Sequence, residues 1–317
     1  MRFAFIGAGA VGGYYGALLA RAGHEVAFVA RGPHLEAIQR SGIRVVSSAV
    51  GDFTAHVTAE SDAGRIGAVD VAVLTVKTYD NDTALPSLAR LVGPATTALT
   101  LQNGVDSADE VAVAVGQSQT LAGATYIATA IEAAGVIRQT GSHRRIVFGE
   151  CFNPAPAATP RVVAIHDAFK AADIQSEPVA DARTALWEKF VYLAPFAAFT
   201  GASRLPIGPL WADADSKSAL IAAFGEVAAL ARASGIGLPD DAVAKIEAYA
   251  TRIPAATRSS LQNDLSQGRR LELESLAGSV VRRANAVGVP TPIMRALYAV
   301  LKPYASGRPA ESQTVNV

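Results

Sequence analysis

The stretch Met1–Gly16 constrains the fold more than any other part of the chain. An apolar run, Phe3–Ile6, leads directly into Gly7-x-Gly9-x-x-Gly12 and then into small residues. A strand, a tight glycine turn and a helix N-terminus in this order begin a parallel α/β sheet that binds the diphosphate of a dinucleotide. Gly7 permits the turn, Gly9 lets the backbone approach the diphosphate, and Gly12 lets the helix pack on the strand. The predicted cofactor-binding residues of this turn are Gly7, Gly9, Ala10, Val11 and Gly12.

The second predicted strand, Glu25–Ala30, ends at Arg31. In proteins that bind NAD, the residue about 20 positions after the glycine turn is usually acidic and binds the ribose 2′-hydroxyl. A guanidinium instead suits a 2′-phosphate, to which it can donate two hydrogen bonds. The sequence therefore favours NADPH over NAD. The competing interpretations are a solvated loop arginine and a glycine turn that serves helix packing alone.

Two polar residues follow later strands of the same predicted sheet. Lys77 comes after the buried-type strand Asp70–Thr75, and Asn103 comes after Thr97–Leu101, within Gln-Asn-Gly. The carboxyl ends of parallel strands share the edge at which open α/β sheets bind ligands. Each residue alone is as typical of a turn as of a site, because Asn-Gly is itself a turn signal.

The 317 residues are enough for about two domains. Short strand patterns between residues 120 and 150, separated by glycine turns, predict an antiparallel addition to the sheet. After Pro178 the pattern is helical, with helices expected at 181–199 and 271–287 among others. We therefore expect residues 1–179 to form a Rossmann-type, doubly wound α/β domain that binds NADP. Residues 180–317 are expected to form an all-helical substrate and catalytic domain.

Composition excludes several classes of partner. Lys plus Arg and Asp plus Glu both number 28, so no basic field favours nucleic acid or an acidic membrane. No segment is long and apolar enough for a membrane span, and no signal-peptide pattern precedes the first strand. The five histidines have no metal-ligand spacing, so no metal site is expected. The single cysteine, Cys151, suggests a reducing, cytoplasmic location. The oligomeric state is open, and a homodimer is compatible with the sequence.

Lys189 is the candidate proton donor. It lies in LWEKF, within a predicted helix that is apolar around most of its circumference. A helix of this kind is buried, and burial lowers the pKa of a lysine towards a value useful for proton transfer. Hydride addition to a carbonyl leaves charge on oxygen, which a proton donor relieves. A solvated surface lysine is the competing interpretation.

The whole pattern resembles the ketopantoate reductase (2-dehydropantoate 2-reductase) family of pantothenate biosynthesis. The matching segments are GAGAVG at 7–12, Ala30-Arg31, LTVK at 74–77, QNG at 102–104, LWEK at 186–189, SSLQND at 259–264 and LELE at 271–274. The resemblance implies NADPH-dependent reduction of a 2-oxo acid to a 2-hydroxy acid, with the following roles. Arg31 and Lys77 bind the adenosine phosphate end, Asn103 lies by the nicotinamide and substrate, Lys189 is the general acid, Glu272 binds the new hydroxyl and orients Lys189, and Ser260 binds the substrate carboxylate.

The chain departs from the family pattern on the helix of Lys189. The family has asparagines four and eight residues after the lysine, where this chain has Leu193 and Ala197. These positions share the helix face of Lys189 and are expected to contact the substrate. The substrate is therefore ketopantoate or a more apolar 2-oxo acid. A non-catalytic NADPH sensor and an NAD-linked hydroxy-acid dehydrogenase are the rival functions. Retention of both Lys189 and Glu272 opposes the first rival, and Arg31 opposes the second.

Overall fold

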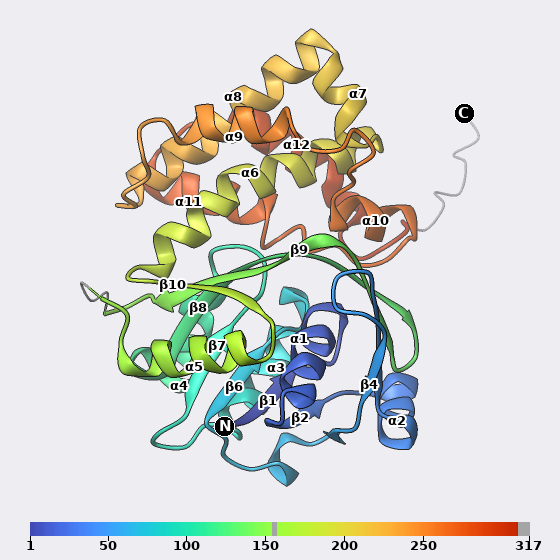
Figure 1. Cartoon of the computed structure of the whole chain (residues 1–317). Coiled ribbons are helices and arrows are strands. Elements are labelled where there is room, and N and C mark those ends of the chain that lie inside the picture. The colour runs from blue at the N-terminus through green and yellow to red at the C-terminus, as the bar shows by residue number, and fades with distance from the viewer. Residues whose placement is uncertain (154–156, 310–317) are drawn as a thin grey trace. The chain divides into compact units, whose positions relative to one another are not determined.

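The computed structural model describes residues 1–153 and 157–309. The chain divides into two compact units, Met1–Leu186 and Trp187–Val317 (Figure 1). This division falls inside helix α6 (Ala182–Ser203). The domain boundary expected after residue 179 lies at the end of strand β10 (Gln175–Val179), just before α6, and stays a prediction.

The first unit is built on a doubly wound sheet, as the sequence predicts. Six strands run parallel in the order β5-β2-β1-β6-β7-β8, so the strand order reverses beside β1. A ligand crevice is expected where two neighbouring strands send their connections to opposite sides, here between β1 and β6. The bounds are β1 (Arg2–Ile6), β2 (Glu25–Val29), β5 (Thr58–Glu60), β6 (Val71–Leu74), β7 (Thr97–Thr100) and β8 (Thr120–Ala133).

Helices cover both faces of this sheet (Figure 1). One core cluster joins Phe5 of β1 to Leu18 and Phe169, which come from α1 and α5. The cluster on the other face joins Leu74 to Leu88 of α3. The strands read as continuous apolar runs because each is buried on both sides. The bounds are α1 (Ala10–Arg21), α2 (Gly32–Ser41), α3 (Asn81–Ala89), α4 (Ser107–Val115), α5 (Pro160–Ala171) and the short turns η1 (Ala63–Arg65), η2 (Thr78–Asp80) and η3 (Gln117–Gln119).

An antiparallel addition extends the sheet beyond β8, which confirms the expectation for this region. Strand β9 (Val136–Glu150) pairs antiparallel with β8, and β10 and β3 (Ile43–Ser47) pair parallel with β9. Strand β4 (Phe53–Ala55) forms the edge, antiparallel to β3. Two short strands were expected where β9 runs. The pairing skips from Thr140 to Arg144 against consecutive residues of β8, so the expected turn is an irregularity inside one strand.

The second unit is built of helices joined by loops, with no strand among its described residues, as predicted. Helix α8 contacts four others, namely α7, α9, α11 and α12, and so forms the centre of the unit. Glu272 lies in the loop that precedes α11, not inside a helix beginning at 271, so that expectation is wrong. The bounds are α7 (Ile207–Ala212), α8 (Ala214–Ala233), α9 (Ala242–Ala250), α10 (Ser260–Ser266), α11 (Ala277–Val287), α12 (Pro292–Leu301) and η4 (Lys302–Tyr304).

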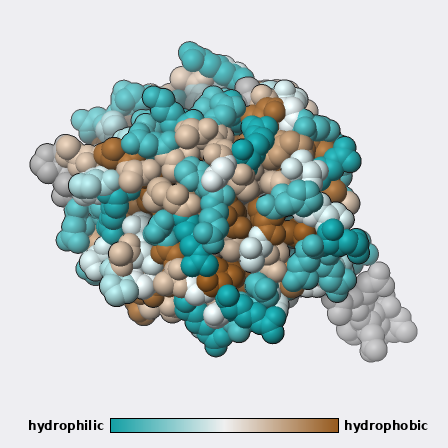
Figure 2. Space-filling view, turned by 60° about the horizontal axis from the view of Figure 1, so that its bottom comes forward, coloured by the Kyte–Doolittle hydropathy of each residue, from teal (hydrophilic) through white to brown (hydrophobic). Residues whose placement is uncertain are grey.

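The surface reflects the balanced composition. On the face shown in Figure 2, hydrophilic residues cover most of the area and hydrophobic residues are exposed near its middle. Among the helices that the structure describes, none combines the length and the apolar character needed to cross a membrane.

Candidate active site

The glycine turn adopts the conformation that the sequence predicts from its spacing. Gly7 has a φ of +103°, which L-residues rarely adopt, and its N–H donates to the carbonyl of Val29 over 3.0 Å. A Cβ atom at Gly12 would collide with the carbonyl oxygen of Gly7 and with the side chain of Thr75. The Thr75 hydroxyl donates to that same carbonyl over 2.8 Å. Helix α1 therefore packs against the carboxyl ends of β1 and β6 at a distance that only glycine allows at position 12.

Gly9 differs from Gly7 and Gly12, the other two glycines of the motif, in the space around it. A Cβ atom there would meet nothing within 4 Å, although Gly9 lines a cavity. Gly9 is also the N-cap of α1, with no side-chain cap, and the first turn of α1 carries no acidic residue. The backbone N–H groups and the positive end of the helix dipole are thus left for an anion. This arrangement fits the diphosphate of a dinucleotide.

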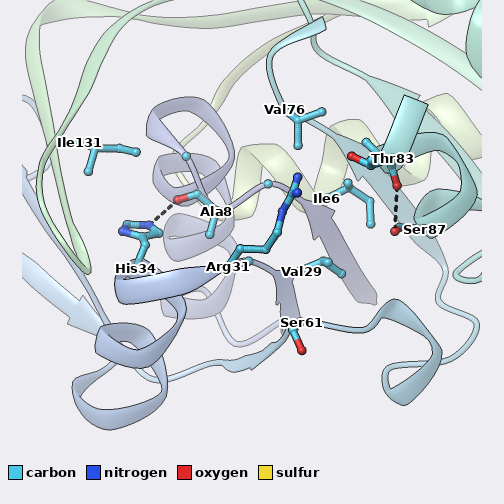
Figure 3. Close-up of a pocket in the computed structure, with 14 residues that line it drawn as sticks. Ile6, Ala8, Val29, Arg31, His34, Ser61, Val76, Thr83, Ser87 and Ile131 are labelled. Carbon is cyan, nitrogen blue, oxygen red and sulfur yellow. Dashed lines mark hydrogen bonds between the residues drawn. The ribbon is translucent and has the colours of Figure 1, made fainter. Parts of the chain in front are cut away.

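A cavity of about 360 Å³ joins the glycine turn to the end of β2. Arg31 is the only Lys, Arg, Asp or Glu among the described residues that line it. Figure 3 shows the Arg31 side chain extending into the cavity between Ala8 and Ile6. Ser61 lies below it, beyond the end of β5. The structure therefore brings together the glycine turn and Arg31, which lie far apart in the sequence.

A buried amide network links the two loops that carry Lys77 and Asn103. The Nε2 group of Gln102 donates to the carbonyl of Val76 over 2.8 Å and to Oδ1 of Asn81 over 2.7 Å. Gln102 and Asn81 are both buried. Val76 lines the cavity and immediately precedes Lys77. Gln102 thus fixes the ends of β6 and β7 relative to each other, next to both predicted site residues.

The second unit carries the predicted acid and its surroundings on α6. Burial lowers the pKa of Lys189 to about 8, and the carboxylate of Glu272 opposes part of this shift. Glu272 itself is only 4% exposed. Leu193 and Ala197 follow Lys189 at helical intervals of four, so all three lie on one face of α6. A lysine with this pKa can donate a proton near neutral pH.

The SSLQND segment is tied to the same helix. The hydroxyl groups of Thr200 and Ser259 lie 2.7 Å apart, and both residues are buried. Ser259 caps α10 by accepting from the N–H of Gln262 over 3.0 Å. Ser260, the predicted substrate residue, is exposed and begins α10. Ser259 therefore has the capping role, and Ser260 is left for other contacts.

Several cavity residues escaped the sequence analysis, among them Ser61 and Ile131. His34, Thr83 and Ser87 line the cavity from α2 and α3. Ser87 donates to the carbonyl of Thr83 over 3.2 Å, along the wall that faces the glycine turn (Figure 3). The sequence held one signal for His34. It follows Arg31 by three residues, so on a helix that starts at Arg31 the two side chains lie on the same side.

Comparisons with known proteins identify the family. The model of the family "Ketopantoate reductase PanE/ApbA" matches residues 3–152, and that of its C-terminal part matches residues 181–305. The 2-dehydropantoate 2-reductase of Halobacterium salinarum is 31% identical to this chain, over 94% of this chain and 96% of its own. The chain belongs to the ketopantoate reductase family. It is accordingly an oxidoreductase of the ketopantoate reductase type, which reduces a 2-oxo acid with a nicotinamide cofactor.

Solved structures agree on the fold of this ketopantoate reductase family member. A PanE/ApbA family ketopantoate reductase from Ralstonia eutropha JMP134 is 33% identical, with a TM-score of 0.86, covering 96% of this chain and 98% of its own. A D-mandelate dehydrogenase with NADH and anilino(oxo)acetate bound is 18% identical, with a TM-score of 0.85, covering 96% of this chain and 98% of its own. At that identity the second likeness concerns the fold alone.

Proposed function

We propose that this reductase uses NADPH and reduces ketopantoate or a more apolar 2-oxo acid. The observation that carries the choice of cofactor is the guanidinium of Arg31, which extends into the cavity beside the glycine turn. A carboxylate for a ribose 2′-hydroxyl is missing among the described cavity residues. The D-mandelate dehydrogenase with the same fold binds NADH, so residues and not the fold must decide the cofactor.

The cofactor assignment is tested by replacing Arg31. Arg31→Ala should raise the KM for NADPH by about 10-fold or more, because a charge-assisted, bidentate pair to the 2′-phosphate is lost. The KM for NADH should stay nearly constant, because NADH carries no 2′-phosphate. Equal effects on both cofactors would remove the NADPH assignment.

The residues of the second unit supply the proton chemistry. When bound, the nicotinamide supplies a hydride to the C2 carbon of the oxo acid. We propose that the Lys189 ammonium donates its proton to the C2 oxygen as charge develops there, which leaves a neutral amine that solvent reprotonates. Glu272 favours the ammonium form and accepts a hydrogen bond from the new hydroxyl. Asn103 and Ser260 are proposed to hold the carbonyl side and the carboxylate of the substrate, and Lys77 the adenosine phosphate.

Removing the proposed acid separates chemistry from binding. Lys189→Ala should lower kcat by about 100-fold or more, which is the usual contribution of a positioned general acid. NADPH affinity, measured by fluorescence titration, should change little. Unchanged turnover in this variant would contradict the mechanism. Tight NADPH binding by the wild-type chain, without turnover of any 2-oxo acid, would favour the non-catalytic sensor instead.

The apolar residues at Leu193 and Ala197 bear on the substrate. A site that hydrogen-bonds a substrate hydroxyl rejects the analogue lacking it by a factor of about 10⁴, whereas an apolar pocket discriminates by about 100-fold or less. The test compares kcat/KM for ketopantoate with kcat/KM for the analogue that lacks only its hydroxyl group. The two values are expected to differ by about 100-fold or less. A preference for ketopantoate near 10⁴ would show that other groups bind the hydroxyl. Leu193→Asn should raise the ratio in favour of ketopantoate.

A further inference from the structure

The far part of the β8–β9 hairpin borders the cofactor cavity. Ile131 of β8 lines the cavity while 52% of the residue is exposed. In Figure 3, Ile131 and His34 lie on one side of the cavity, and Thr83 and Ser87 lie on the other. Ile131 therefore presents apolar surface to the same cavity that the glycine turn and Arg31 line. The part of β8 that carries Ile131 pairs antiparallel with β9, whereas the parallel pairing of β8 with β7 is confined to Thr120–Ala122.

His34 joins this hairpin to the glycine turn. Its Nε2 atom lies 2.7 Å from the carbonyl oxygen of Ala8, and the N–H of Gly135 donates to its Nδ1 atom over 2.9 Å. A carbonyl oxygen can only accept and a backbone N–H can only donate, so Nε2 is the donor and Nδ1 the acceptor in these two contacts. One imidazole therefore spans from the turn at the diphosphate position to the end of the hairpin.

Further contacts hold the hairpin end in place. The N–H of Arg44 on β3 donates to the carbonyl of Gly135 over 2.8 Å. Gly135 has a φ of +76°, and a Cβ atom there would lie 3.0 Å from Cβ of Ala37 on α2. Both backbone polar groups of Gly135 are thus used, and the residue packs directly on α2. The hairpin end is therefore held to β3, to α2 and, through His34, to the glycine turn.

We propose that the end of the β8–β9 hairpin is a further wall of the dinucleotide site. Ile131 provides an apolar contact to the cofactor beside its diphosphate, and His34 is the positioning residue that sets the distance between hairpin and turn. This inference rests on the proposed NADPH-dependent function. It assigns to the antiparallel addition a role in cofactor affinity that the parallel sheet and its glycine turn do not supply.

The test is a fluorescence titration of NADPH against matched variants. Ile131→Ser should raise the Kd by about fivefold, because part of an apolar contact area is lost. His34→Ala should raise it by about 10-fold, since the turn and hairpin are no longer joined. His34→Asn should recover part of this loss, because its amide oxygen can accept from Gly135 near the Nδ1 position. The controls Val113→Ser, exposed on α4, and Arg40→Ala, exposed on α2, should bind as the wild type does.

Steady-state kinetics and melting curves complete the test. The KM for NADPH should follow the Kd values, while kcat at saturating NADPH stays nearly constant. If His34→Ala melts at a lower temperature, Ile131→Ser decides alone, because its exposed side chain adds little to folding. Wild-type affinity in both variants would overturn the inference and leave the proposed function standing. A wild-type chain that does not bind NADPH would overturn both.

Discussion

At the scale of single residues, the pKa of Lys189 is the property with the most direct kinetic consequence. The general acid must be protonated, and burial lowers its pKa to about 8. The protonated fraction falls as pH rises, so kcat for reduction should decline as pH passes through about 8. A pH–rate profile with a saturating 2-oxo acid measures this limb. A kcat that does not change between neutral pH and about pH 10 would contradict the assignment of Lys189 as the general acid.

Glu272 offers a sharper version of the same measurement. Its carboxylate raises the pKa of Lys189 against the effect of burial, so Glu272→Gln should move the alkaline limb to lower pH. Glu274→Gln is the matched control. Glu274 pairs with Arg282 and Lys302 and accepts a hydrogen bond from Tyr298. Its charge is therefore balanced by groups other than Lys189. An identical shift in both variants would indicate a general effect of charge and not a specific pair.

Cys151 gives a residue-scale prediction outside the site. It is buried, and burial raises the pKa of its thiol to about 12. The reactive thiolate is therefore almost absent at neutral pH. An aromatic disulfide reagent should leave the native chain unlabelled and should label one thiol per chain after unfolding in urea. Rapid labelling of the native chain would show that the region around Cys151 opens readily.

At the scale of elements, two glycines of one turn have different roles, because Gly12 allows helix packing and Gly9 leaves space for the cofactor. Gly12→Ala should lower the free energy of unfolding by about 2 kcal/mol or more, because its Cβ meets the backbone of Gly7 and the side chain of Thr75. Gly9→Ala should change that free energy by less than about 0.5 kcal/mol. The methyl group at Gly9 instead occupies space where the diphosphate is proposed to bind, and should raise the Kd for NADPH at least about 10-fold. Urea unfolding and cofactor titration of both variants check this pair, and equal stability losses would contradict it.

Local patterns predicted the elements whose burial is visible in their own residues. The apolar runs gave the parallel strands, because strands buried on both faces contain few polar residues. Helix α4 was missed, although Asp106 followed by Asp109 and Glu110 before an apolar run is itself a signal for a helix N-terminus. The turn expected between two short strands is wrong, because β9 runs through it with only a shift in its pairing to β8. The structure of β9 depends on its partners β3 and β8, which no local pattern contains.

The candidate site was also predictable only in part. Arg31 and the glycine turn are recognisable because the chemistry of a phosphate restricts the residues that can bind it. His34 and Ile131 could not be predicted, because the contact between His34 and Gly135 joins positions 101 residues apart. The places of Lys77, Asn103, Ser260 and Glu272 in catalysis stay predictions.

At the scale of the whole molecule, cofactor binding should be visible as stabilisation. A ligand that binds only the native state at about 100 times its Kd adds about 2.7 kcal/mol to the free energy of unfolding. NADPH should therefore raise the apparent melting temperature, and NADH at the same concentration should raise it less, because Arg31 has no 2′-phosphate to bind. Arg31→Ala should reduce the difference between the two cofactors. A thermal shift assay measures this, and equal shifts in the wild type would contradict the NADPH preference.

The continuity of α6 has a consequence for recombination between genes of this family. The helix begins at Ala182, and the two compact units part after Leu186, within its first turns. A chimera joined after Leu186 would combine the first turns of one parent's helix with the remainder from another parent. A crossover placed at Ala180, before the helix begins, keeps Lys189 and its neighbours on a helix of single origin. Chimeras of the second kind should exchange substrate preference between parents while each keeps the coenzyme preference of its N-terminal parent.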